Sequence, residues 1–330
     1  MFKNRLYFDV AYYRNVESDF IINGGVSQAT GYEGVQTNFK EKRLRKGIEV
    51  TIGGTPIQTR DFKWDILTNW GHDKYEYLEI DPEYSTNRPW IKKGESWHWI
   101  EVKDWDRDPD GNIIHNGGMP QRQEFNTKVG NTTPDLIWGI TNTFKYKQFT
   151  LDFSFDGRIG GISYSRTHQM LWNTGVHIDS DNMYRYEEVV NGNLTYIGKG
   201  VKIVSGTVTR DPDGNILEDT RVFAPNDEVV SYEAYISKYH DAHNRPARQN
   251  YLRETFFKLR NLSLTYDLPV SLCNKLSMKS ASVGITGQNL FFWGLDYKYA
   301  DPDKGGDDKG HENLNSPLQR YMGINLKVNF

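Results

Sequence analysis

Hydrophobic and polar residues alternate along this chain in eight separate segments. The clearest begins at Phe149, where an apolar residue at every second position up to Phe155 alternates with threonine, aspartate or serine. Successive side chains of a β-strand point to opposite faces, so a period of two residues predicts strands with one apolar and one polar face. The other segments cover residues 6–12, 48–52, 62–70, 138–146, 262–266, 283–285 and 324–330. The pattern predicts an all-β chain of about eight strands.

The connections between these segments are alternately short and long. The short ones cover residues 54–61, 147–148 and 267–275, and the long ones residues 17–38, 76–134, 161–253 and 292–318. In an antiparallel meander, this alternation places every tight turn at one end of the sheet and every long loop at the other. Bacterial outer-membrane barrels have this arrangement, with short turns in the periplasm and long loops outside. We therefore predict an antiparallel portion of a transmembrane β-barrel, with long extracellular loops and both chain ends on the periplasmic side.

Two other interpretations fit the same strands. One is a small stand-alone outer-membrane barrel that acts as a pore or an adhesin, since an even number of strands can close. The other is a soluble, β-rich carbohydrate-binding module with one wet face. Loops of this length are rare in compact soluble domains, which favours a barrel. No stretch approaches the ~20 consecutive apolar residues of a membrane helix, whereas a membrane strand needs only ~9–11 residues, half of which are polar.

Composition narrows the class of protein further. The 330 residues include 9 Trp, 20 Tyr and 16 Phe, an aromatic content of 14% that excludes a disordered chain. Lys and Arg total 40 and Asp and Glu total 43, so a strongly basic nucleic-acid binder is excluded and we expect no nucleic-acid partner. Cys273 is the only cysteine, which rules out an intramolecular disulfide.

Tryptophans gather in the long loops. Trp90, Trp97, Trp99 and Trp105 lie in one predicted outer loop, and Trp172 lies in the longest one. Flat indole faces near carboxylates and amides suit sugar rings, so Trp90, Trp97, Trp99 and Trp172 are candidate substrate contacts. The alternative, which we favour, is that these indoles pack the loops together, because ordered loops of this length must bury apolar area.

Other aromatic residues lie near the predicted strand ends. They are Trp64, Trp70, Trp138 and Tyr146. Aromatic rings at both ends of the strands form girdles at the lipid interfaces of membrane barrels. We predict that these four residues belong to such girdles.

One acidic motif resembles the start of a calcium-binding loop. Asp106, Asp108 and Asp110 stand at alternate positions before Gly111, but Gly117 replaces the glutamate expected six residues after that glycine. Residues 210–215 (RDPDGN) repeat the core of the motif. Two Asp-Pro-Asp-Gly turns in outer loops explain the same residues, and we prefer them to a metal site.

Residues that carry chemistry elsewhere are sparse. His240 and His243 supply too few ligands for a zinc site. The chain has no nucleophile elbow, no phosphate-binding glycine loop and no CxxC pair. We therefore expect no catalytic residue, no cofactor and no enzymatic activity.

Several sequence blocks along the chain form a recognisable set. They are residues 46–50 (KGIEV) with 61–64 (DFKW) and Asn69, residues 130–134 (GNTTP) followed by Gly139, Asn142, Tyr146, Lys147 and Phe149, residues 256–269 (FFKLRNLSLTYDLP), residues 287–291 (GQNLF), residues 301–303 (DPD) and residues 323–330 (GINLKVNF). These blocks resemble SusC/RagA-type TonB-dependent outer-membrane transporters. The blocks follow one another in the order of the family, from near the first residue to the last. Each block is weak alone, but together they are specific.

The resemblance implies a 22-stranded barrel that imports oligosaccharides or peptides. In the family, a plug fills the barrel, a TonB box couples it to the TonB-ExbB-ExbD complex, and a SusD-like surface lipoprotein covers the loops. We find no plug, TonB box or signal peptide, and expect residues 1–330 to be the C-terminal part of such a barrel, surrounded by outer-membrane lipid. By the same resemblance, Phe330 is the terminal aromatic residue read by the barrel-assembly machinery.

Eight strands are too few to close a 22-stranded barrel, so the resemblance also predicts an open wall. One edge should lie at residues 2–14 and the other at residues 320–330. In a stand-alone eight-stranded barrel these two edges would instead pair with each other.

Overall fold

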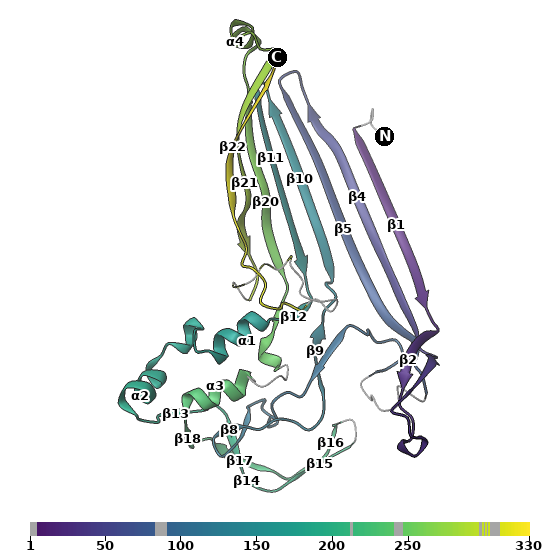
Figure 1. Ribbon diagram of the computed structural model, residues 1–330, viewed down its shortest axis with the longest axis vertical. Coiled ribbons are helices and arrows are strands. Elements are labelled where there is room, and N and C mark those ends of the chain that lie inside the picture. Colours follow the sequence, from purple (N-terminus) through teal and green to yellow (C-terminus); the bar gives the residue numbers. More distant parts are fainter. Residues whose placement is uncertain are drawn as a thin grey trace.

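The computed structural model describes residues 5–82, 91–211, 214–240, 247–296, 299, 301, 303 and 311–330. Its largest element is an antiparallel sheet of eight strands, which we call the wall (Figure 1). The strands of the wall are β1 (Leu6–Glu17), β4 (Lys42–Gln58), β5 (Phe62–Glu79), β10 (Leu136–Tyr146), β11 (Phe149–Ile159), β20 (Phe256–Asp267), β21 (Ser280–Trp293) and β22 (Tyr321–Asn329). Their order in the sheet is their order in the chain, so all eight predicted strands and the meander are confirmed.

The wall is open. Its outer strands, β1 and β22, each pair with one neighbour, and among the described residues they do not pair with each other. Figure 1 shows them on opposite sides of the sheet. The predicted open edges are confirmed, and a closed eight-stranded barrel is not formed.

The tight turns and the long loops lie at opposite ends of the wall, as predicted (Figure 1). The short connections are residues 59–61, residues 147–148 and the segment that holds α4 (Val270–Lys275). The first long loop holds β2 (Phe20–Gly24), the 3-10 turn η1 (Gln28–Thr30) and β3 (Val35–Phe39), and the second holds β6 (Trp99–Val102), β7 (Ile114–Asn116), β8 (Met119–Pro120) and β9 (Thr127–Asn131).

The longest loop has helices that strand periodicity did not predict. It holds β12 (Ile162–Tyr164), α1 (Arg166–Asn173), η2 (Ile178–Ser180), α2 (Met183–Asn191), β13 (Tyr196–Ile197), β14 (Val201–Ser205), β15 (Val208–Arg210), β16 (Ile216–Asp219), β17 (Val222–Pro225), β18 (Val229–Val230), α3 (Tyr232–His240), η3 (Arg248–Asn250) and β19 (Tyr251–Arg253). Strand β14 pairs with β7 of the preceding loop, so the two loops are joined by backbone hydrogen bonds. Within the described part of the chain, none of the helices is long and apolar enough to cross a membrane.

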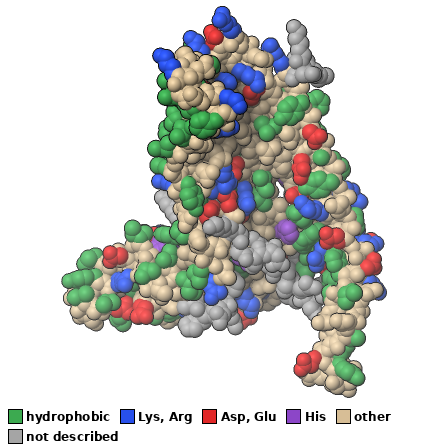
Figure 2. Space-filling view, turned by 45° about the horizontal axis from the view of Figure 1, so that its top comes forward, with side chains coloured by type: hydrophobic (Ala, Val, Ile, Leu, Met, Phe, Trp, Pro, Cys, Tyr) green, Lys and Arg blue, Asp and Glu red, His purple; other side chains and the backbone are tan. Residues whose placement is uncertain are grey.

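The two faces of the wall differ in chemistry. Cross-strand register places Phe8 beside Ile52, and Ile285 beside Ile324, on one face. Phe8, Ile285 and Ile324 remain 63%, 60% and 81% exposed, which is unusual for apolar side chains on a water-facing sheet and ordinary for a lipid-facing one. Hydrophobic side chains are prominent on the wall in Figure 2. We call this the apolar face and the opposite one the polar face; the long loops meet the polar face at one end of the wall.

A bulge in β20 decides which face Lys258 occupies. Simple alternation would place it with Leu262 and Leu264 on the apolar face. The register shifts between Leu259 and Asn261, so that Lys258 pairs with Asp156 of β11 on the polar face. There Lys258 is fully buried, and its Nζ lies 2.6 Å from Asp303 and 3.5 Å from Asp301. The bulge thus turns a lysine away from lipid and makes it the anchor of the last long loop.

Aromatic rings gather near both ends of the apolar face. Toward the tight turns, Trp64 stacks on Phe144 at 5.5 Å and Phe149 lies 4.8 Å from Tyr266. Toward the loops, the aromatic group contains Trp138, Phe257 and Trp293. This is the arrangement expected of two lipid-interface girdles.

A polar residue, Asn142, lies between these girdles on the apolar face. It pairs with Ile66 on one side and Phe153 on the other, and it is only 7% exposed. The Trp64 indole donates a hydrogen bond of 3.1 Å to its Oδ1, which offsets the cost of placing an amide against lipid. The indole N–H of Trp64, a residue of the girdle, therefore also provides the hydrogen bond that the buried Asn142 side chain needs.

The assignment of the two faces predicts unequal effects of adding charge. Phe153→Arg places a cation on the apolar face, midway between the girdles, and should cost about 2–4 kcal/mol of folding free energy. Thr141→Arg is the matched control, because Thr141 is exposed, pairs with Ser154 beside Phe153, and lies on the polar face. Unfolding in lipid vesicles measures both. Equal tolerance of the two substitutions would contradict the assignment.

Candidate functional site

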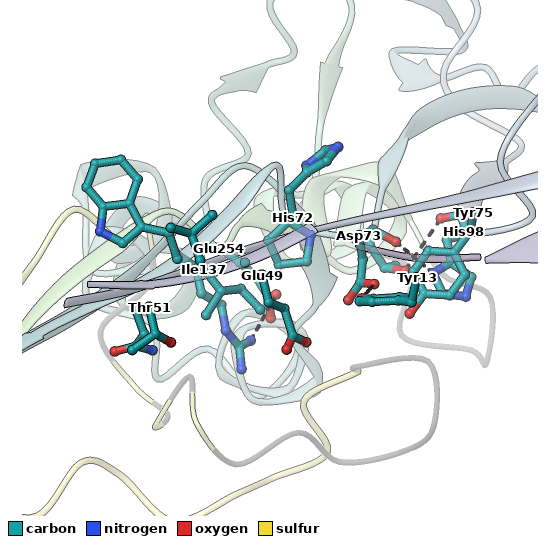
Figure 3. A pocket seen from close by; sticks show the side chains of 17 residues that line it. Tyr13, Glu49, Thr51, His72, Asp73, Tyr75, His98, Ile137 and Glu254 are labelled. Atoms are coloured by element: carbon teal, nitrogen blue, oxygen red, sulfur yellow. Dashed lines mark hydrogen bonds and ion pairs between the residues drawn. The ribbon is translucent and has the colours of Figure 1, made fainter. Parts of the chain in front are cut away.

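A cavity of about 590 Å³ lies on the polar face, where the wall meets the loops. Figure 3 shows the side chains around it, and we call it the wall pocket. Strands β1, β4 and β5 contribute Tyr13, Glu49 and Asp73, while the second long loop contributes His98 and Thr133. Arg158 and Glu254 close the side toward the longest loop. The pocket thus joins the wall to two of the four long loops.

Strand parity determines which side chains reach the pocket. In Figure 3, Glu49 and Thr51 extend to one side of the sheet and His72 extends to the other. Glu49 and Ile137 both pair with Gly71, which therefore lies between them on the polar face. A Cβ built on Gly71 would meet nothing within 4 Å, so the floor of the pocket is open above this glycine.

A hydrogen-bonded cluster forms one end of the wall pocket. The Tyr13 hydroxyl donates to Asp73, and the Arg45 guanidinium lies 3.4 Å from the same carboxylate. The Tyr13 ring lies directly over Gly47, where a Cβ would approach its hydroxyl to 2.4 Å. Glycine is required there because any side chain would displace the ring.

His98 covers this cluster from the loop side. Its ring stacks on Tyr75 with centroids 4.1 Å apart, and its Nδ1 lies 2.7 Å from the Thr133 hydroxyl. Burial lowers the pKa of His98, so its imidazole is neutral at neutral pH. At the opposite end, Arg158 and Glu254 form an ion pair of 3.5 Å. The pocket presents carboxylates, guanidinium groups and hydroxyls, which suit reversible binding of a polar solute.

The glycines of the wall pocket predict a matched pair of substitutions. Gly47→Ala should destabilise the protein by about 1–3 kcal/mol, because the new methyl overlaps the Tyr13 hydroxyl and the His72 carbonyl. Gly71→Ala should change stability by less than about 0.5 kcal/mol, since its methyl enters open space. Equilibrium unfolding in detergent measures both. If adding Tyr13→Ala to the Gly47→Ala variant restores its free energy of unfolding, the overlap with the Tyr13 ring causes the loss of stability.

The long loops contain two columns of stacked rings. In the first, Trp105, Tyr239, Tyr235 and His115 follow one another with centroids 5.8, 6.0 and 5.9 Å apart. In the second, Trp172 lies between His177 at 4.2 Å and His240 at 4.5 Å, nearly parallel to both. Tyr239 and His240 meet edge to face at 5.3 Å and join the columns.

Asn250 determines the hydrogen positions in the second column. Its Nδ2 donates to the His240 carbonyl at 2.9 Å, so its Oδ1 is the atom that faces the imidazoles. That oxygen lies 3.2 Å from His168 Nδ1 and 3.3 Å from His240 Nδ1, and a carbonyl oxygen only accepts. Both Nδ1 atoms must therefore carry hydrogen. The Trp172 indole donates to His168 Nε2 at 3.2 Å, which fixes His168 as a neutral ring.

The three histidines around Trp172 predict a loss of stability in acid. Burial lowers the pKa of His168 and His177, and lowers that of His240 to about 3. The unfolded chain binds these protons near pH 6.5, so folding free energy is lost as the pH falls from about 6.5 toward 3. Nuclear magnetic resonance of labelled histidine rings measures the titrations, with His240→Asn to assign one signal. A His240 midpoint near 6.5 would contradict the buried stack.

The tryptophans singled out as substrate contacts are mostly engaged by the protein. Both faces of Trp172 are covered by imidazoles, and Trp97 packs edge to face on Tyr75 and Tyr77. Trp99 is 39% exposed, with the Lys128 ammonium 5.6 Å from its ring. Trp90 lies outside the described residues. Of the described candidates, Trp99 has the most open ring.

The calcium candidates form the tips of two similar turns. Asp106 is held by Arg210 and Arg221, each at 3.2 Å. Asp108 accepts hydrogen bonds from the backbone and side chain of Asn112 at 2.7 and 2.9 Å. Asp211 accepts the same two bonds from Asn215, both at 2.8 Å, so the repeated sequence forms repeated turns.

The described residues contain no group of three or more His, Cys, Asp or Glu side chains arranged to hold a metal ion. Asp110 is exposed at the tip of its turn. His240 belongs to the stacked column, while His243 lies outside the described residues. The hydrogen bonds of Asp108 and Asp211 are those of two Asp-Pro-Asp-Gly turns.

Phe330 directly follows β22 and is 79% exposed. Val328 pairs with Ala281 on the apolar face, so alternation places Phe330 on the same face.

The sequence did not single out the residues of the wall pocket. Strand alternation places the strand residues of this pocket on the polar face. The fold of the loops determines where along the strands Tyr13, Asp73 and Glu254 come together.

Comparisons with known proteins give one consistent group of relatives. No family model matches the chain. TonB-dependent receptors P3, P39 and P26 of Formosa agariphila are 22%, 25% and 22% identical to it, over 374, 376 and 369 aligned residues. These alignments cover 99 to 100% of this chain and 33 to 34% of the relatives. The chain therefore spans about one third of the length of the relatives it matches.

Solved structures agree in fold. The RagAB peptide importer in the open-open state is similar with a TM-score of 0.63 and 17% identity, over 100% of this chain and 33% of that one. Its closed-closed state gives a TM-score of 0.59, again at 17% identity, over 100% of this chain and 34% of that one. The comparisons confirm the predicted resemblance, the fold class of an antiparallel barrel portion and the outer-membrane location.

Proposed function

We propose that this chain, which is similar in sequence and fold to about one third of a TonB-dependent receptor, is the C-terminal part of the barrel of an outer-membrane nutrient importer. The observation that carries the proposal is the open wall. It has an exposed apolar face, a polar face that meets the loops at one end, and outer strands whose free edges have no partner among the described residues. In lipid, each unpaired backbone group costs several kcal/mol, so such a wall is stable only within a larger closed barrel.

The proposed activity is passage of a solute along the polar face, with no covalent bond made or broken. Asp, Asn, Lys and Thr side chains of the wall provide a wet surface for a polar solute. The wall pocket lies at the entrance to this surface, between the strands and the loops. We propose no enzymatic activity and no cofactor for this chain.

We further propose the partners that the resemblance implies. A SusD-like surface lipoprotein would cover the loops, and the TonB-ExbB-ExbD complex would act through an N-terminal part of the same protein. The solute would be an oligosaccharide or a peptide. RagAB, which is similar in fold, is named as a peptide importer, and this supports the second class of solute.

The two rival functions each conflict with one observation. A stand-alone pore or adhesin needs a closed barrel, but β1 and β22 do not pair with each other in the part of the chain that the structure describes. The side chains of Phe8, Tyr12 and Ile324 are 63%, 68% and 81% exposed. In a soluble carbohydrate-binding module these apolar side chains would face water, which is unfavourable. Both observations favour a membrane barrel with additional strands.

Fractionation of the producing cells tests the proposal. An antibody against the exposed helix α2 should detect a protein about three times the length of this chain, because the relatives are covered to only 33 to 34%. That protein should appear in the outer-membrane fraction and resist extraction by salt. A 38.3 kDa species in the soluble fraction would contradict the proposal.

A further inference from the structure

Three basic side chains lie side by side at the loop end of the apolar face. Arg14 of β1 pairs directly with Lys46 of β4, and Lys46 pairs directly with Lys74 of β5. Tyr12 and Ile48 pair with each other at the neighbouring position toward the tight turns, two residues along each strand. The three cations therefore share a face with exposed apolar side chains, and we call them the basic row.

Charge on the apolar face is confined to this corner of the wall. In β10, β11, β20, β21 and β22, which the structure describes in full, alternation and register place no charged side chain on that face. The charged residues of the face all lie in β1, β4 and β5, on the loop side of Trp70. They are Arg14, Lys42, Lys46, Lys74, Glu76 and Glu79. The basic row is thus a local feature and not a general property of the loop end of the wall.

The basic row carries more positive charge than the described residues neutralise. Glu76 bonds both lysines, with its oxygens 3.0 Å from Lys46 Nζ and 2.5 Å from Lys74 Nζ. Arg14 is exposed and has no ion-pair or hydrogen-bond partner among the described residues. Like charges directly opposite each other on neighbouring strands repel, because their Cβ atoms are only about 4.5–5.5 Å apart. Three cations share one carboxylate here, so an anion bound across the row would relieve their repulsion.

The girdle near the loops shows the depth of the basic row in the membrane. Trp70 pairs with Trp138 of that girdle, and Lys74 follows Trp70 by four residues on the same strand. At about 3.4 Å per residue and a strand tilt of about 40°, four residues rise about 10 Å along the membrane normal. The head-group layer extends about 5–8 Å beyond the hydrocarbon, and long basic side chains bend toward it. The charged ends of the row therefore reach the lipid head groups of the outer leaflet.

We infer that the basic row binds the phosphate of an outer-leaflet lipid, whose acyl chains lie on the apolar side chains below the row. The inference rests on the proposed importer function, because it requires a wall that stands in an outer membrane with its long loops outside. It adds a ligand site on the lipid side of the barrel, separate from the path of the solute.

Both parts of such a lipid match the surface. A phosphate offers acceptor oxygens to the two lysines, and the planar guanidinium of Arg14 can bind two of them at once. Val10, Tyr12 and Ile48 are exposed on the same face and provide an apolar surface for the acyl chains. A free phosphate ion would use the same cations but would gain nothing from these apolar side chains, which favours a lipid.

Native mass spectrometry of the full-length protein that contains this chain tests the inference, by titration with diphosphorylated lipid A in detergent. The same lipid without its phosphates should bind about tenfold more weakly, because each basic residue at an anionic membrane surface contributes to binding. Excess inorganic phosphate should not displace the phosphorylated lipid, since the free ion has no acyl chains to place on the apolar face.

Substitutions in and beside the basic row should have effects of opposite sign. Arg14→Gln should weaken binding of the phosphorylated lipid about fivefold and leave the described fold intact, because Arg14 has no partner there. Glu76→Gln should strengthen binding, because it frees two lysines from a competing carboxylate. Lys42→Gln is the matched control on the same face as Lys46. Its ammonium is already paired with Glu79 at 3.0 Å, so the affinity should not change.

Three results would overturn the inference. They are equal affinity for the lipid with and without phosphates, complete displacement of the lipid by inorganic phosphate, and equal losses of affinity in Arg14→Gln and Lys42→Gln. Each would leave the importer proposal intact, because cell fractionation measures the location and length of the protein separately. Absence of the protein from the outer membrane would remove the importer proposal, and the lipid site with it.

Discussion

The structure depends on one constraint, which is that backbone N–H and C=O groups in lipid have no water to bind. A sheet in hydrocarbon must therefore pair every strand edge. Seven pairs of neighbouring strands meet this requirement between β1 and β22. The outer edges of β1 and β22 have no partner strand among the residues that the structure describes. The apolar face of the wall, its girdles and its outward phenylalanines make sense only in lipid, and lipid in turn requires more strands than the wall contains.

The same constraint explains where the wall departs from simple alternation. Lys258 would face lipid without the bulge in β20; with it, the lysine is buried against Asp303 and anchors the last long loop. Asn142 does lie on the apolar face, but it is only 7% exposed and the Trp64 indole donates a hydrogen bond to its oxygen. In Figure 2, acidic and basic side chains lie beside one another where the wall meets the loops. Charge in this molecule is concentrated on the polar face, in the loops and at the end of the wall that meets them.

The wall was predictable from the sequence because strand period and loop parity are local properties. Alternation such as Phe149 to Phe155 specifies a strand and its faces without reference to the rest of the chain. The bulge at Leu259 was not predicted, although the apolar positions change parity there, from Phe257 and Leu259 to Leu262 and Leu264. The helices of the longest loop and the stacking of Trp172 between His177 and His240 depend on contacts between distant segments, which a single sequence does not reveal. For the same reason, residues of the wall pocket could be assigned to a face or a loop but not to a common site.

Hydrogen exchange of the edge strands in native outer membranes tests the central claim most directly. Every second amide of β1 and β22 points away from its neighbour in the wall. If the wall is part of a larger closed barrel, these amides should be as protected as those of β10 and β11, because missing strands bond them. Rapid exchange of the same amides in β1 and β22, with protection confined to the inner strands, would contradict the account.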